Sequence, residues 1–159
     1  IPAQIMSLAD KVMLEAAPSL RAPQSVREGD FGPDIVEVKS GNDLLDVVIE
    51  QAKILLTNVG EGNVAIVCPD DMTDAVDSAL TAAGVAHGRA NTTALDSRLT
   101  VVPVSVVKGL ELDGVLVVEP ARIVASQVHG LRALYVALTR STQRLTVVHS
   151  EPLPSAMQS

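Results

Sequence analysis

The stretch VAIVCPDDMTDAVDSALTAAG, residues 64–84, decides the fold. It opens with an unbroken apolar run, Val64–Cys68, which is typical of a strand buried on both faces. Pro69 and Asp70 end this run, and apolar residues then recur at helical spacing up to Gly84, a residue favoured just after a helix. A buried strand that leads directly into a helix is the repeating unit of α/β folds.

The same alternation continues along the chain on both sides of this stretch. Further apolar strands are predicted at residues 35–38, 99–104, 115–118 and 145–149. Helices are predicted at residues 2–17, 40–60 and 131–140. Ser40 is the expected N-cap of the second helix, with Asp43 in capping-box position. Strands that are apolar on both faces need helices on both sides of a mainly parallel sheet, so the sequence predicts a doubly wound α/β domain.

Composition limits the class of protein. A chain of 159 residues that is 47% hydrophobic has the size and character of one globular domain. The net charge of −7 argues against a free-standing nucleic-acid binder, which needs a basic face. Residues 1–95 hold 14 acidic and 6 basic residues, whereas residues 96–159 hold 5 and 6. The second part is therefore expected to present a near-neutral or locally basic surface.

The single cysteine, Cys68, excludes an internal disulfide and is consistent with a reducing cytoplasm. No apolar run is long enough for a membrane span, so no membrane partner is expected. The first residue is Ile1 rather than Met, from which we expect a fragment of a longer protein. Residues 1–150 are interpreted as one domain, and the Pro- and Ser-rich residues 151–159 as a flexible tail.

No metal site is predicted. The three histidines are scattered without the spacing of metal ligands: His87, His129 and His149. Asp70 and Asp71 stand at the start of a helix, where acids usually cap or complement the helix dipole rather than bind Mg²⁺.

Two segments stand out for their chemistry. Residues 106–113 place a cation, a flexible glycine and an acid at the entrance of the strand 115–118. Residues 134–141 end a helix with Thr139 and Arg140 at its negative dipole end and lead into the last strand. Each segment alone would also suit a charged connector or a helix cap. Ligands of such sheets sit at the carboxyl ends of the strands, where we expect the functional loops.

In their order and spacing these segments resemble motifs V and VI of UvrD/Rep-type superfamily 1 helicases. The wording VVKGLELDGVLVVEP with LRALYVALTRSTQRLTVV most resembles the helicase IV/HelD-like branch, whose actinobacterial members associate with RNA polymerase. The resemblance implies the second RecA-like domain, a three-layer P-loop NTPase-like fold. This domain lacks its own Walker A loop, since the only Gly-Lys order is reversed, as Lys108-Gly109.

The resemblance also implies roles for individual residues. Arg140 would be the catalytic arginine finger, reaching the γ-phosphate of ATP with Mg²⁺, which the absent first RecA-like domain would mainly hold. Glu111 would accept hydrogen bonds from the ribose, and the backbone of Gly109 would line the nucleotide. The nucleic-acid-facing residues would be Ser105, Val106 and Lys108. The residues supporting Arg140 would be Thr139, Tyr135 and Arg132.

The predicted function is the C-terminal motor half of an ATP-dependent helicase or translocase, inactive as an isolated chain. DNA and RNA polymerase are the candidate partners besides the first RecA-like domain. The family's usual His-Ser-x-Lys-Gly reads Ser-Val-Val-Lys-Gly at residues 105–109, so DNA, RNA and a protein complex all stay open as substrates. An alternative is a docking module on RNA polymerase with little nucleic-acid contact. A receiver-like regulatory domain with Asp70 as phosphoacceptor would leave the paired segments unexplained.

Overall fold

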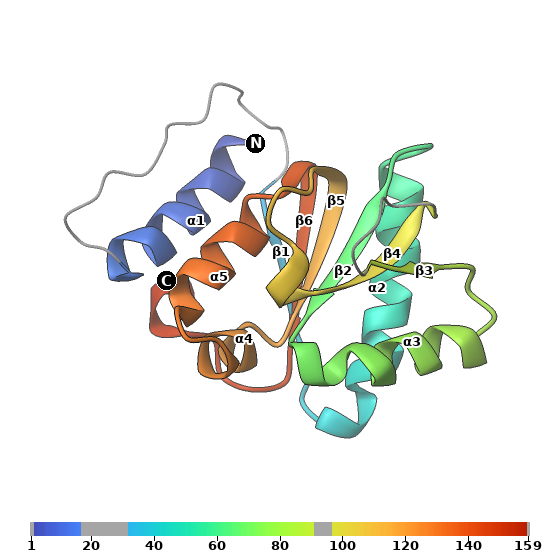
Figure 1. The fold of residues 1–159 in the computed structure, drawn as a ribbon. Coiled ribbons are helices and arrows are strands. Elements are labelled where there is room, and N and C mark those ends of the chain that lie inside the picture. Colours follow the sequence, from blue (N-terminus) through green and yellow to red (C-terminus); the bar gives the residue numbers. More distant parts are fainter. Residues whose placement is uncertain (1, 17–31, 91–96, 159) are drawn as a thin grey trace.

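A computed structural model describes residues 2–16, 32–90 and 97–158 (Figure 1). They form a six-stranded sheet in the order β1-β6-β5-β2-β4-β3, and every pair of neighbours is parallel. The strands are β1 (Asp34–Glu37), β2 (Val64–Cys68), β3 (Gly88–Arg89), β4 (Leu99–Pro103), β5 (Leu112–Val118) and β6 (Ser141–His149).

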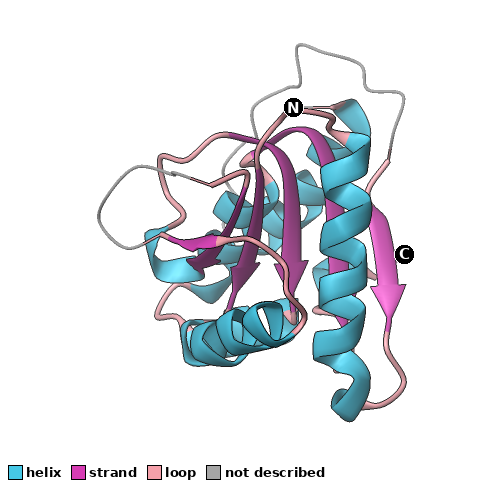
Figure 2. Cartoon of the chain, turned by 90° about the vertical axis from the view of Figure 1, so that its right-hand side faces the viewer, coloured by secondary structure: helices cyan, strands magenta, loops and turns pink. Residues whose placement is uncertain are grey.

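Helices cover both faces of this sheet, and Figure 2 shows the strands with helices on either side. The helices are α1 (Ala3–Ala16), α2 (Leu44–Asn58), α3 (Thr73–Ala82), α4 (Pro120–Ser126) and α5 (Gly130–Leu138). One hydrophobic core joins the sheet to α1, α4 and α5, and a second joins it to α2 and α3. The doubly wound, parallel α/β fold predicted from the sequence is confirmed.

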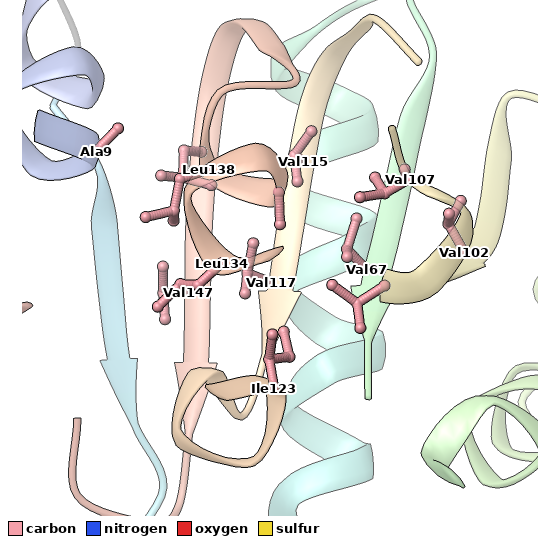
Figure 3. Packing of buried hydrophobic residues seen from close by; sticks show 14 of the residues in the cluster. Ala9, Val67, Val102, Val107, Val115, Val117, Ile123, Leu134, Leu138 and Val147 are labelled. Carbon is pink, nitrogen blue, oxygen red and sulfur yellow. The ribbon is translucent and has the colours of Figure 1, made fainter. Parts of the chain in front are cut away.

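Strand β5 supplies both cores because successive side chains of a strand point to opposite faces. Val115 and Val117 pack under α5, near Leu138 (Figure 3). Leu116 and Val118 point the other way, into the core beneath α2 and α3. All four strand residues are fully buried, which explains why the sequence is apolar at every position rather than at alternate ones.

Pairing between strands moves several boundaries away from the predicted ones. β6 begins at Ser141 rather than at Leu145, because Ser141 is in register with Leu112 of β5. β5 likewise begins at Leu112 and not at Val115. Helix α4 was not predicted. This short helix follows Glu119, whose backbone is left-handed at φ 50°. Hydrophobic runs mark where strands lie, whereas ladder hydrogen bonds decide where they begin.

Two local predictions were only partly correct. Ser40 does act as an N-cap, but it accepts a hydrogen bond from the Asn42 amide at 3.3 Å and caps the 3₁₀ turn Gly41–Asp43. The α2 helix itself begins at Leu44, directly after this turn. The strand predicted to reach residue 104 ends at Pro103, since Val104–Val106 turn into a 3₁₀ helix.

The segment after residue 150 packs against the domain. The sequence predicted a flexible tail there, yet Ser155–Met157 form a 3₁₀ turn. Met157 is only 4% exposed and belongs to the same core as Ile5 and Leu8 of α1. Burial of a methionine side chain offsets the local Pro- and Ser-rich composition, so the folded unit continues past the boundary expected at residue 150.

Candidate functional site

The two segments singled out in the sequence meet at the amino-terminal edge of strands β5 and β6. The Leu112 amide donates to the Arg140 carbonyl at 3.0 Å, and Leu112 is in register with Ser141. Glu111, which is exposed, directly precedes Leu112. Glu111 and Arg140 therefore stand side by side at the starts of neighbouring strands. This edge is opposite to the carboxyl edge at which the sequence analysis expected the functional loops.

Arg140 is partly buried and folds back over the end of α5. Its Nε donates to the Val136 carbonyl at 2.9 Å, and its guanidinium also donates to Thr139 Oγ1 at 3.0 Å. Thr139 Oγ1 in turn donates to the carbonyl of Tyr135 at 3.0 Å. A cation is favoured at this negative end of the helix dipole. Contact with a phosphate would require Arg140 to exchange these carbonyl bonds for phosphate oxygens.

Tyr135 occupies the interface between α5 and α1. Burial, followed by the nearby Asp10 carboxylate, raises the pKa of Tyr135, and the Arg140 cation partly opposes this. Burial also raises the pKa of Asp10, whose Oδ1 is buried without a hydrogen-bond partner. Tyr135 and Thr139 therefore both lie next to Arg140. Arg132, the third predicted support, is exposed and lines a groove instead.

A tight turn carries the start of the 108–111 segment. The Leu110 amide donates to the Val107 carbonyl at 3.2 Å, and Gly109 has a φ of 88°. A side chain at Gly109 would meet no atom within 4 Å, so the backbone angle rather than space requires glycine there. Val107 is buried and anchors the turn in the core beside Val67 and Val102 (Figure 3). Lys108 and Gly109 are consequently exposed on a fixed support.

A groove of about 380 Å³ lies between the loop 104–108, the connection from α4 to α5, and α5 itself. Ser105 and Lys108, two of the three residues predicted to face nucleic acid, line it, whereas the third, Val106, is 38% exposed and is not part of the lining. The complete lining is Val104, Ser105, Val107, Lys108, Gln127, Val128, His129, Arg132, Ala133 and Val136. The sequence analysis missed the groove, because its walls come from segments far apart in the chain.

Acidic groups at the carboxyl edge are used inside the domain. Asp70 Oδ1 accepts a hydrogen bond from the Ser105 amide at 3.1 Å, and Asp71 accepts one from Arg122 at 2.9 Å. Glu119, only 2% exposed, accepts bonds from the Ser150 amide at 2.7 Å and the Ser150 hydroxyl at 2.6 Å. Among the described residues, no group of three or more His, Cys, Asp and Glu side chains could hold a metal ion.

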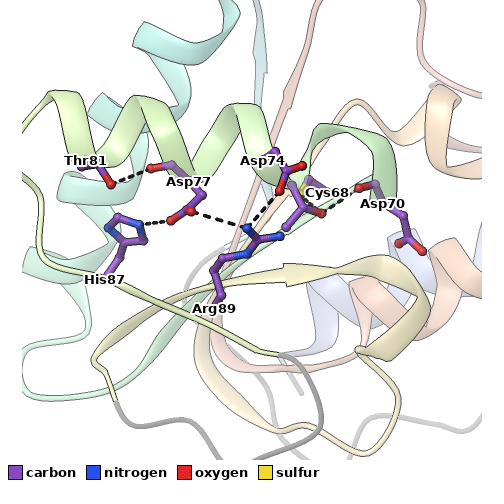
Figure 4. A network of polar contacts seen from close by, with 8 residues as sticks. Cys68, Asp70, Asp74, Asp77, Thr81, His87 and Arg89 are labelled. Atoms are coloured by element: carbon purple, nitrogen blue, oxygen red, sulfur yellow. Dashed lines mark hydrogen bonds and ion pairs between the residues drawn. The ribbon is translucent and has the colours of Figure 1, made fainter.

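Another polar network fastens β3 to α3 (Figure 4). Asp77 Oδ1 contacts His87 Nε2 at 2.5 Å, and Arg89 bridges Asp74 at 2.9 Å and Asp77 at 3.5 Å. His87 Nδ1 lies 2.8 Å from the Val85 carbonyl. These contacts hold the short edge strand in place, so His87 has a structural environment.

Cys68 is enclosed at the end of β2. Its Sγ lies 3.8 Å from Thr73 Oγ1, and the side chain is fully buried. Burial, the largest cause, raises the pKa of the Cys68 thiol to about 11. The thiol is therefore neutral and unreactive, as expected for a core cysteine.

No helix in the described ranges has both the length and the apolar character needed to cross a membrane.

The parallel three-layer arrangement also occurs in solved helicase structures. No protein-family model matches the sequence, and no curated protein matches it. Among solved structures, the chain is similar to the C-terminal domain of a possible DNA helicase from Lactobacillus plantarum WCFS1. That match has a TM-score of 0.73 and 21% identity, and it covers 98% of this chain and 91% of the other.

Two further solved structures are those of the arterivirus helicase, nonstructural protein 10. The complex with DNA matches with a TM-score of 0.52 and 18% identity, over 96% of this chain and 34% of that one. A second structure of the same viral helicase matches with a TM-score of 0.51 and 15% identity, over 96% of this chain and 33% of that one. This chain thus spans about a third of the viral helicase. At these identities the matches show the fold, which is that of a helicase C-terminal domain.

Proposed function

We propose that this chain is the C-terminal motor half of a UvrD-like, ATP-dependent helicase or translocase of the HelD-like kind. The observation that carries the proposal is the hydrogen bond from the Leu112 amide to the Arg140 carbonyl. It joins the two motif-bearing segments, although almost thirty positions separate them in the sequence. A coincidental resemblance in two separate segments would not require them to meet in space.

The residues at this edge fit one side of a nucleotide. Arg140 supplies a planar cation suited to phosphate oxygens, and Glu111 supplies an exposed carboxylate for ribose hydroxyls. The turn at Gly109 leaves an open backbone surface. No Walker A loop occurs in the sequence, so ATP and Mg²⁺ would be held mainly by a first RecA-like domain. When bound, ATP would supply the energy of phosphoryl transfer, and Arg140 would stabilise its developing charge.

The loop after β4 would connect the nucleic-acid surface with the ATP site. It starts at the carboxyl edge with the turn Val104–Val106 and reaches the amino edge at Glu111 (Figure 1). Ser105, Val106 and Lys108 would face the nucleic acid at its beginning, and Glu111 would face ATP at its end. A shift at one end of so short a segment would move the other end through Val107, which is packed in the core between them.

ATP hydrolysis tests this proposal. We expect the isolated chain to show none, and detectable turnover by pure 1–159 would overturn the shared-site assignment. In the longer protein that joins this domain to a first RecA-like domain, Arg140→Ala should lower turnover by about a thousandfold, as loss of an arginine finger does. Arg89→Ala is the matched control, since Arg89 pairs with Asp74 and Asp77 far from this edge. Unchanged turnover in Arg140→Ala would contradict the proposal.

One observation favours a second candidate, a docking module on a protein assembly such as RNA polymerase. Five residues that line the groove beside Ser105 and Lys108 are aliphatic, and none is a Phe, Tyr or Trp on which a base could stack. Single-stranded nucleic acids are commonly held by such stacking. A groove with aliphatic walls is better suited to a protein segment.

A further inference from the structure

The groove continues around the connection between α4 and α5. A second concavity of about 340 Å³ shares four lining residues with the first: Gln127, Val128, His129 and Arg132. Gly130 fixes this connection, since a Cβ there would overlap the Val124 carbonyl. The close approach of α4 and α5 therefore gives the surface a defined shape before any partner binds. We call the two concavities together the α4–α5 groove.

The charge of the groove is opposite to that of the chain. Lys108, Arg132 and His129 line it, and none of the lining residues of either concavity is acidic. The whole chain carries a net charge of −7. A local basic surface on an acidic protein attracts a negatively charged ligand.

The groove also exposes aliphatic surface. Val128 lines both concavities and is 95% exposed. It is one of only five large hydrophobic side chains that are exposed among the described residues. The buried Val107 and the partly buried Val136 form part of the wall. Grouped apolar side chains rimmed by polar ones are typical of protein interaction sites.

From this combination we infer that the α4–α5 groove docks a short acidic segment of a partner protein. An aliphatic side chain of that segment packs against Val107, Val128 and Val136. Carboxylates next to it pair with Lys108 and Arg132. The segment needs both features, because the cations alone would hold any polyanion and the valines alone would hold any apolar peptide. This inference gives Lys108 a protein ligand in place of the nucleic acid proposed above, and it is independent of the ATP role of Arg140.

Fluorescence anisotropy with the 159-residue chain provides the test. The probe is a fluorescein-labelled synthetic peptide rich in glutamate and leucine. Two control peptides carry glutamine for glutamate, or serine for leucine. We expect the first peptide to bind, and each control to bind at least about tenfold more weakly, which corresponds to about 1.4 kcal/mol.

Charge reversal in the groove provides the matching protein variants. Lys108→Glu with Arg132→Glu should weaken binding of the acidic peptide at least about tenfold. Lys39→Glu with Lys53→Glu changes the net charge equally on exposed sites outside the groove, and should leave most of the binding. Val128→Ser should weaken binding while preserving the thermal midpoint, since this side chain is almost fully exposed. Unaltered binding in either groove variant would overturn the inference.

Other occupants give different results. If oligo(dT) binds the groove and displaces the peptide, and the serine-substituted peptide binds as well as the leucine-bearing one, the groove takes a polyanion and the inference is wrong. If sedimentation shows a dimer that Val128→Ser dissociates, the occupant is a second copy of the chain and the inference is again wrong. The ATPase test of Arg140→Ala is unaffected by these outcomes, so the two proposals fail separately.

Discussion

The carboxyl edge and the amino edge of the sheet both carry charged side chains, which differ in burial and in hydrogen bonding. At the carboxyl edge, Glu119 is buried and accepts three hydrogen bonds from Ser150 and Glu151. At the amino edge, Glu111 is exposed, and the guanidinium of Arg140 donates to the end of its own helix. A buried charged side chain with several hydrogen bonds inside the domain stabilises the fold. A charged side chain that is exposed, or that is bonded to a helix end, is available to a ligand.

Removing a satisfied group should have the largest effect on stability. Glu119→Ala removes a buried carboxylate and leaves the part-buried Ser150 and Glu151 amides without their partner. We expect the free energy of unfolding to fall by about 3 kcal/mol, measured by urea denaturation. Glu111→Ala, the matched change at the exposed edge, should cost less than about 0.5 kcal/mol. Equal losses in the two variants would remove the distinction between the edges.

Burial of Cys68 at the carboxyl end of β2 should make the stability of the protein depend on pH. The raised pKa of Cys68, about 11, means that the folded state favours the neutral thiol. This stabilisation is complete below the ordinary thiol pKa near 9 and is lost as the pH rises through about 11. The loss should be on the order of 2 kcal/mol. Cys68→Ala serves as the reference, and identical slopes of stability between pH 9 and 11 in both proteins would contradict the assignment.

The turn before the amino edge should depend on its glycine to a smaller extent. Gly109→Ala forces a side chain onto a backbone with φ 88° and should cost about 1 kcal/mol. Lys108→Ala, one residue away and exposed, should change stability by less than about 0.5 kcal/mol. Thermal unfolding followed by circular dichroism measures both. A neutral Gly109→Ala would mean that the turn relaxes freely and does not fix Glu111.

The smallest effect on folding is expected at Arg140. Arg140→Ala removes two hydrogen bonds at the end of α5, which should cost about 0.5–1 kcal/mol. For a domain of this size that corresponds to a fall in thermal midpoint of a few degrees, roughly 2–4 °C per kcal/mol. A fall of ten degrees or more would identify Arg140 as a structural residue and remove it from the proposed ATP site.

Much of the fold was predictable because burial on both faces leaves a simple signature. Val64–Cys68 is apolar at every position, and the structure contains the strand with those bounds. Helix α3 and its end before Gly84 also follow from local spacing. The short helix α4 did not, since the Glu119 before it is held by Ser150, which follows β6. Local pattern cannot report a constraint that lies thirty residues away.

The candidate site was predictable in composition but not in position. Gly109, Glu111 and Arg140 were identified from two motif-like segments, and their roles remain proposals. Their location at the amino edge was not foreseen, because the general rule for parallel sheets points to the opposite edge. The groove with Arg132 and Val128 was missed for another reason: single exposed side chains leave no periodic pattern in a sequence.

By itself the sequence determined the class of fold and pointed to candidate residues for its chemistry. Short runs of Val, Leu and Ile that alternate with helical segments favour strands buried between helices, so local hydrophobicity was sufficient. The tertiary structure alone decided which segments meet. The strand order β1-β6-β5-β2-β4-β3 puts the start of β5 beside the start of β6, and so Glu111 beside Arg140. The same packing opens the α4–α5 groove, because a groove exists only between surfaces that distant parts of the chain bring together.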